Sequence, residues 1–151
     1  MKKMKKIAIA LLGFAGIVAF SAQAQIKPED AIKLRQSAMK LIGYNFGNIG
    51  AMVQDKKPYN KDEAIRNASR VDALSTQPFE FFIAGTDKGE TKAKAEIWKD
   101  GDKFKAAAEK MQGEVGKLAQ VAKTGDMAAL KAQFGTTGGA CKACHDDFRE
   151  K

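Results

Sequence analysis

Residues 28–54 read PEDAIKLRQSAMKLIGYNFGNIGAMVQ, and their hydrophobic spacing decides the fold class. Long, mostly apolar side chains recur at alternating intervals of three and four residues, which places them on one face of an α-helix. These positions are Ile32, Arg35, Met39, Ile42, Phe46, Ile49 and Val53. Pro28 suits a first helical turn, and Pro58 lies beyond the last one. The spacing therefore predicts an amphipathic helix over residues 28–54.

Three glycines, Gly43, Gly47 and Gly50, lie inside this predicted helix. Each costs up to about 1 kcal/mol relative to alanine unless close packing uses the missing side chain. Two interpretations stay open for them. They allow close packing inside the protein, or they allow a second copy of the chain to approach.

The chain from Asn60 onward repeats the helical spacing. Asn60 and Glu63 resemble a capping box at the start of a second helix over residues 61–75. Apolar positions between 97 and 122 predict a third helix that ends before Gly125, and Asp126 caps a fourth helix that runs to the C-terminus. Four amphipathic helices with three connections form an antiparallel four-helix bundle most economically, so we expect an all-α fold.

One segment between the second and third predicted helices breaks this pattern. Residues 77–94 contain Pro78, Gly85 and Gly89 beside the aromatic side chains of Phe79, Phe81 and Phe82. Proline and glycine are typical of turns. Because loops of this length are uncommon unless they have a function, we expect this one to cover something.

The N-terminus has the three-part plan of a secretory signal peptide. Four lysines within residues 1–6 precede an uncharged apolar run over residues 7–20, and Ala22-Gln23-Ala24 offers a cleavage site. The run is shorter than the roughly 20 residues that a membrane-spanning helix needs. We therefore expect a signal peptide over 1–24, cleavage before Gln25, export to the periplasm, and one domain over 25–151. A retained membrane anchor is the alternative.

The charge pattern excludes one class of partner. The formal net charge is +8, and half of it comes from the four lysines of the expected signal peptide. In the remaining chain basic residues are interspersed with acidic ones rather than gathered in a run, so we expect no nucleic-acid partner.

The sequence Cys141-Lys142-Ala143-Cys144-His145 has the C-x-x-C-H pattern of a covalent haem attachment site. Residues three apart on a helix lie on one face, so both sulfurs can reach vinyl groups of the same porphyrin and the next residue can reach the iron. The chain has two cysteines and one histidine, too few for a tetrahedral zinc site. A thioredoxin-like pair would lie at the start of a helix in a βαβ unit, not near the chain end.

The axial ligands of such a haem can be narrowed from composition. With one histidine in the chain, His145 has no histidine partner on the other side of the iron. The methionine candidates are Met39, Met52, Met111 and Met127. We favour Met39, because it lies on the apolar face of the first predicted helix. The alternative is that Met39 only packs beside the haem and leaves the iron five-coordinate.

Together these features resemble the class II c-type cytochromes, the cytochrome c′ family, whose C-x-x-C-H motif lies near the end of a four-helix bundle. The resemblance covers nearly all of residues 25–151. It rests on Lys27-Pro28-Glu29-Asp30-Ala31, Arg35-Gln36-Ser37-Ala38-Met39, Lys57-Pro58-Tyr59, Glu96-Ile97-Trp98 and Cys141-Lys142-Ala143-Cys144-His145-Asp146-Asp147-Phe148-Arg149. It implies one haem c, with Arg35 near its edge, Met39 on its distal face and Arg149 beside the proximal histidine. In the alternative interpretation of these two residues, Arg35 extends from the apolar face to solvent, and Arg149 is a solvated cation that complements the helix dipole.

The resemblance leaves several functional hypotheses open. In most cytochromes c′ the iron is five-coordinate and binds nitric oxide or carbon monoxide, whereas in the cytochrome c-556 branch a methionine ligates and the protein carries electrons. A haem-free bundle with a Cys141–Cys144 disulfide is the third hypothesis. We expect a non-enzyme, because no spare histidine or cysteine remains for catalysis. The expected partners are soluble or membrane-bound redox proteins and, as in family members that pair their first two helices, a second copy of the chain.

Overall fold

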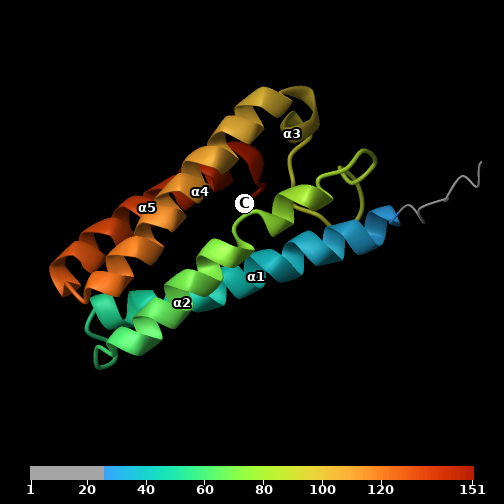
Figure 1. Ribbon diagram of the computed structural model, residues 1–151. Coiled ribbons are helices and arrows are strands. Elements are labelled where there is room, and N and C mark those ends of the chain that lie inside the picture. The colour runs from blue at the N-terminus through green and yellow to red at the C-terminus, as the bar shows by residue number, and fades with distance from the viewer. Residues whose placement is uncertain (1–25) are drawn as a thin grey trace, which may run out of the picture.

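The computed structural model describes residues 26–151 (Figure 1). The expected signal peptide over 1–24 and its cleavage site lie outside the described residues. The elements are α1 (Pro28–Val53), α2 (Lys61–Leu74), the 3-10 helix η1 (Gln77–Phe81), α3 (Glu96–Lys99), α4 (Gly101–Thr124) and α5 (Met127–Phe148). Within residues 26–151, none of the helices combines the length and apolar character needed to cross a membrane.

The four long helices form an antiparallel bundle. In Figure 1, α1 and α2 lie side by side, α4 and α5 form a second pair, and successive long helices run in opposite directions. Between residues 26 and 151 the only extended pairing is one isolated bridge that joins Ala93 to Arg149. The predicted all-α four-helix bundle is therefore confirmed.

Side-chain caps fix the starts of two helices where the sequence predicted them. The Asn60 side chain accepts a hydrogen bond from the backbone N–H of Glu63 at 2.9 Å. The Asp126 carboxylate accepts from Ala128 N and Ala129 N at the start of α5. Gly125 adopts a φ of +79° between α4 and α5, a conformation that favours glycine. Helices α2 and α5 consequently begin within a residue of their predicted starts.

The prediction of one unbroken third helix from Ile97 was wrong. The structure has the short helix α3, a break at Asp100, and then α4. Asp100 has φ −126° and ψ 65°, and its carboxylate accepts a hydrogen bond from Lys103 N. The break arises because Asp100 caps the start of α4 with its side chain, while the apolar spacing continues across it.

The core at one end of the bundle is apolar and closed. It is formed by buried residues of all four long helices: Ile49, Met52, Val53, Ala64, Ala68, Leu118, Ala119, Ala122 and Leu130. Phe46 of α1 and Phe134 of α5 stack against this core, with ring centroids 4.2 Å apart.

The glycines of α1 differ in their surroundings. A Cβ added at Gly50 would lie 2.9 Å from Cζ of Phe134, whereas none of the neighbouring atoms comes within 4 Å of such a Cβ at Gly43 or Gly47. Gly50 thus serves the close approach of α1 and α5, which is the first of the two interpretations. Gly43 and Gly47 leave the second one open.

Gly50→Ala should destabilise the protein, because the added methyl group meets a ring that is held by its stack with Phe46. We expect the free energy of unfolding to fall by about 1–3 kcal/mol in urea titrations. The matched control Gly47→Ala, one turn earlier in α1, should raise it by up to about 1 kcal/mol. Equal effects of the two substitutions would contradict this account of the packing.

Candidate functional site

The other end of the bundle contains a cavity of about 640 Å³. Helices α1, α3, α4 and α5 line it together with η1 and the loop that follows η1. The lining residues are Arg35, Gln36, Met39, Lys40, Phe79, Phe82, Thr91, Lys92, Ala93, Ile97, Phe104, Cys144, His145, Phe148 and Arg149. Its volume lies in the range of about 300–1,000 Å³ that is typical of cofactor sites.

Arg35 organises the loop that covers this cavity. Its side chain is only 3% exposed, so the alternative in which it extends to solvent is wrong. One guanidinium nitrogen donates to Phe81 O at 3.1 Å and to the Thr86 hydroxyl at 2.7 Å. The other donates to Thr86 O at 2.7 Å and to the Thr91 hydroxyl at 2.8 Å. All four acceptors are neutral, and burial lowers the pKa of Arg35.

Aromatic rings form the wall beside Arg35. The Arg35 guanidinium lies 4.5 Å from the ring centroid of Phe82, a cation–π distance. Phe82 packs edge-on against Phe104 at 4.9 Å, and Phe104 packs likewise against Phe148 at 5.2 Å. Trp98 donates its indole N–H to the carbonyl oxygens of Phe82 and Ile83, which holds the loop in place. The predicted covering role of residues 77–94 thus has a physical basis.

The C-x-x-C-H residues lie on the last turns of α5. Cys144 and His145 line the cavity, and Cys141, one turn earlier, packs against a cluster that includes Val71 and Met111. Neither cysteine forms a disulfide. Burial raises the pKa of both thiols, and for Cys144 the neighbouring Cys141 and the negative charge of Asp147 add to the effect.

His145 and Arg149 line both this cavity and a second, more polar pocket at the end of α5. His145 is exposed to solvent on one side, yet partial burial lowers its pKa, and the charge of Arg149 lowers it further. Both effects favour the neutral imidazole, which is the form that ligates a metal.

A short strap joins the loop to the end of α5. Lys94 N donates to Phe148 O at 3.0 Å, and Glu150 N donates to Lys92 O at 2.8 Å. The Lys94 ammonium donates to the carbonyl oxygens of Asp146 and Asp147, which are among the free carbonyls at the helix end. Residues 92–94 therefore fix the turn that carries His145.

The structure separates the methionine candidates. Met39 lines the cavity. Met52 is buried in the closed core, Met127 packs against that core, and Met111 belongs to the second buried cluster. Of these four side chains, Met39 alone contributes to the cavity wall, as its position on the apolar face predicted.

Five of the six residues singled out from sequence line this one cavity, and Cys141 lies one turn away on the same helix. Sequence reasoning missed Thr86 and Thr91, which hold the Arg35 guanidinium. Neither threonine belongs to a recognisable motif, and both lie more than 50 positions from Arg35. Their role could not be read from local spacing.

The residues around the cavity fit a haem c. A haem is a flat, largely apolar ring with two carboxylates, and here the aromatic side chains supply an apolar wall. Arg35 is a buried cation with no carboxylate in ion-pair distance among residues 26–151. It could therefore form an ion pair with a haem carboxylate. Two free thiols on one helical face and a neutral imidazole complete the set of groups that hold haem c.

Comparison with known proteins also relates this chain to proteins that bind haem. Residues 30–149 match the Cytochrome C′ family. Cytochrome c′ of Rubrivivax gelatinosus is 51% identical over 126 residues, which cover 83% of this chain and 98% of the relative. The structure of cytochrome c prime from Shewanella frigidimarina has a TM-score of 0.81, with 43% identity over 84% of this chain and 99% of that chain. A nitric oxide complex of a variant cytochrome c prime from Alcaligenes xylosoxidans has a TM-score of 0.79, with 39% identity over 84% of this chain and 98% of that one.

Arg35→Met should loosen the covering loop, because Thr86 and Thr91 lose the donors that bind them. We expect the free energy of unfolding to fall by about 1–3 kcal/mol, with faster amide hydrogen exchange over residues 82–94. Gln36→Met is the matched control, since Gln36 makes one exposed hydrogen bond to Glu90 O in the same loop. If both variants lost equal stability and protection, Arg35 would not organise the loop.

Proposed function

The chain belongs to the cytochrome c′ family, which binds haem c, and on this premise we propose that Cys141 and Cys144 hold one haem covalently. In this proposal His145 ligates the iron, and Met39 blocks the distal position without binding. The protein would then bind small gases such as nitric oxide or carbon monoxide, transfer single electrons, or do both.

The convergence of Met39, Cys144 and His145 on one cavity carries this proposal. When bound, the haem supplies an iron that changes between ferric and ferrous states and can take a diatomic ligand at a free axial position. The chain's own residues determine access. Phe79, Phe82 and the other aromatic side chains make the cavity apolar, so a small neutral gas can enter more readily than a hydrated anion.

Arg35 and Arg149 have separate parts in this proposal. Arg35 is buried among neutral acceptors, so a carboxylate at the haem edge would compensate its charge. Arg149 lies one turn after His145, and its charge helps to keep that imidazole neutral. As a charged neighbour of the axial ligand, Arg149 would also influence the reduction potential of the iron.

Whether Met39 ligates the iron or only packs beside it distinguishes the proposed function from the electron-carrier alternative. A thioether can ligate haem iron, which would give a low-spin electron carrier of the cytochrome c-556 type. It can equally fill space as a flexible apolar side chain. The relatives described above are all cytochromes c′, which supports the second role.

Optical spectra of the ferric and ferrous protein, with and without carbon monoxide, test this proposal. We expect a high-spin spectrum that shifts when the gas is added. Met39→Leu should leave the high-spin spectrum unchanged, because it removes the sulfur and keeps the volume. Met39→Ala should raise the affinity for carbon monoxide by about tenfold, because it opens the blocked position.

Met111→Leu serves as the control, since Met111 is buried outside the cavity wall. A low-spin wild type that ignores carbon monoxide and becomes high-spin in Met39→Leu would establish the electron-carrier alternative instead. A colourless protein would favour the haem-free bundle.

The wider biology follows from the same proposal. We place the mature protein in the periplasm, after cleavage before Gln25, with soluble or membrane-bound redox proteins as electron partners. The cavity residues suit binding and electron transfer rather than bond-making catalysis, because the one histidine is used as an axial ligand and both cysteines as attachment points. The protein is accordingly a non-enzyme in this account.

A second copy of the chain is the further partner in this proposal. Leu34, Leu41 and Tyr44 are 44%, 52% and 68% exposed on α1, and their spacing places them on one stripe of that helix. Exposed apolar stripes of this kind mark protein–protein contacts. We therefore propose a homodimer in which the α1 stripes of two copies pack together.

Leu41→Glu should convert such a dimer into monomers, because it introduces a charge at the centre of the apolar stripe. Light scattering at working concentration would give the molar mass of both forms. Gln120→Glu on the exposed surface of α4 is the control and should remain dimeric. A monomeric wild type would rule out the homodimer.

A further inference from the structure

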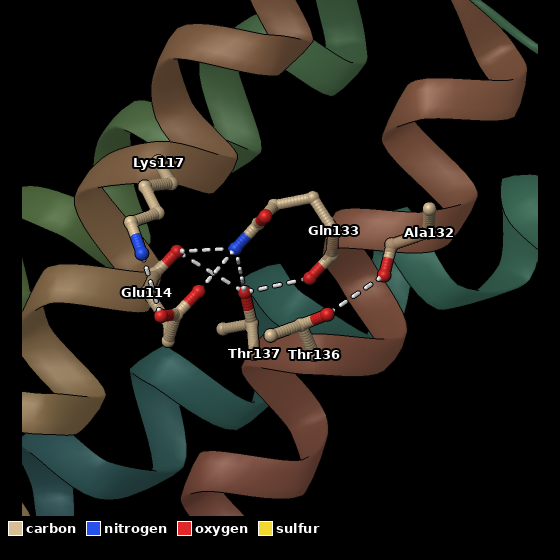
Figure 2. A network of polar contacts seen from close by, with 6 residues as sticks. All are labelled: Glu114, Lys117, Ala132, Gln133, Thr136 and Thr137. Carbon is tan, nitrogen blue, oxygen red and sulfur yellow. Dashed lines mark hydrogen bonds and ion pairs between the residues drawn. The ribbon is translucent and has the colours of Figure 1, made fainter.

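A polar network joins α4 to α5 (Figure 2). The Gln133 side-chain amide donates to the Glu114 carboxylate at 2.8 Å and to the Glu114 carbonyl oxygen at 3.1 Å. The Thr137 hydroxyl lies 3.2 Å from the same carbonyl oxygen and 2.8 Å from the Gln133 carbonyl oxygen. We call Glu114, Gln133 and Thr137 the α4–α5 clamp.

The clamp is partly shielded from water, and its polar groups are paired with one another. Thr137 is completely buried, and the Glu114 side chain is only 16% exposed. Lys117 pairs with the outer carboxylate oxygen of Glu114 at 2.8 Å. Hydrogen bonds from Lys117 and Gln133 lower the pKa of Glu114, so its carboxylate is charged at neutral pH. A polar contact between helices that is this well satisfied specifies one arrangement of the two helices.

The position of the clamp along α5 connects it with the haem-attachment motif. Thr137 lies one turn before Cys141, and residues 133, 137, 141, 144 and 148 follow the spacing of one helical face. A rotation of α5 about its axis would therefore move the clamp residues and the cysteines together. Downstream of the motif, the strap of residues 92–94 holds Phe148 and Glu150. The haem-attachment motif thus lies between two segments of α5 that are held by other parts of the protein, the clamp before it and the strap contacts after it.

We propose that the α4–α5 clamp is a positioning device, which sets the rotation of α5 and thereby the orientation of the His145 imidazole in the cavity. This inference rests on the proposed function, because it concerns the ligand of the haem iron. Thr137 is not among the residues that line the cavity, so it would act on His145 through the helix.

Two neighbouring threonines provide a matched test, and Figure 2 shows both of them. Thr137→Val removes the hydroxyl that reaches α4. Thr136→Val removes the same group from an exposed residue whose hydroxyl donates only to Ala132 O of its own helix. Thr137→Ser restores the hydroxyl without the methyl group. Gln133→Met removes the amide from a half-buried position and serves as a second variant if Thr137→Val does not fold.

The readouts are the reduction potential, the electron paramagnetic resonance spectrum of the ferric haem protein, and amide hydrogen exchange over residues 138–147. For Thr137→Val we expect a shifted potential, altered resonance positions and about five- to tenfold faster exchange, the effect of losing a hydroxyl that is shared between Gln133 O of α5 and Glu114 O of α4. Thr136→Val and Thr137→Ser should match the wild type in all three, and Gln133→Met should resemble Thr137→Val.

Two outcomes would overturn the proposal. In one, Thr137→Val and Thr136→Val give the same potential, resonance spectrum and exchange. In the other, Thr137→Val unfolds more easily but keeps all three wild-type signatures, which would make the clamp structural only. Failure of the proposed function is distinguishable, because it would already appear in the wild-type spectrum before any variant is compared.

Discussion

A buried guanidinium has five N–H donors that need acceptors, and in this protein the acceptors of Arg35 come from the covering loop. Its contacts with Phe81, Thr86 and Thr91 tie the first half of α1 to the end of η1 and to the loop between η1 and α3. That loop is joined in turn to α5 by the bridge between Ala93 and Arg149. The buried Arg35 side chain therefore keeps the open end of the bundle arranged around a cavity. A purely apolar end would instead close by packing its side chains together.

The two ends of the bundle differ in the side chains that they contain and in how tightly these pack. At the closed end α1, α2, α4 and α5 bury aliphatic side chains against one another, and Gly50 lets Phe134 approach α1. At the open end basic side chains gather at the cavity without a carboxylate among its lining residues. Helix α5 passes through both regions, with Leu130 in the closed core, Thr137 at the clamp and Cys144 at the cavity. A chain built in this way can hold a rigid, negatively substituted cofactor at one end while the other end supplies stability.

Much of this arrangement was predictable because helical spacing is a local property. The face from Ile32 to Val53 predicted α1 to within one residue of its end. The motif at Cys141 and Cys144 predicted a cofactor site at the end of the last helix, and Cys144 lines the cavity there. The break at Asp100 was missed because apolar spacing continued through it, although Asp100 followed by Gly101 offered a capping signal.

Other features could not be predicted, because they depend on residues far apart in the chain. Thr86 and Thr91 are acceptors for Arg35 only after the loop folds back over α1. In the sequence Thr137 is one more position on the face of a helix, yet its hydroxyl contacts a backbone carbonyl oxygen of α4 as well as one of its own helix. The sequence specified the side chains, and the tertiary structure determined which of them meet.

Mass spectrometry of tryptic peptides tests the central claim, which is covalent attachment of one haem through both cysteines. Trypsin cleaves after Lys131, Lys142 and Arg149, so it separates the peptide that contains Cys141 from the peptide that contains Cys144. We predict that the two peptides stay joined, with a mass that includes one haem, and that a reducing agent does not part them. Two separate peptides without haem, or a pair that a reducing agent releases, would contradict the account.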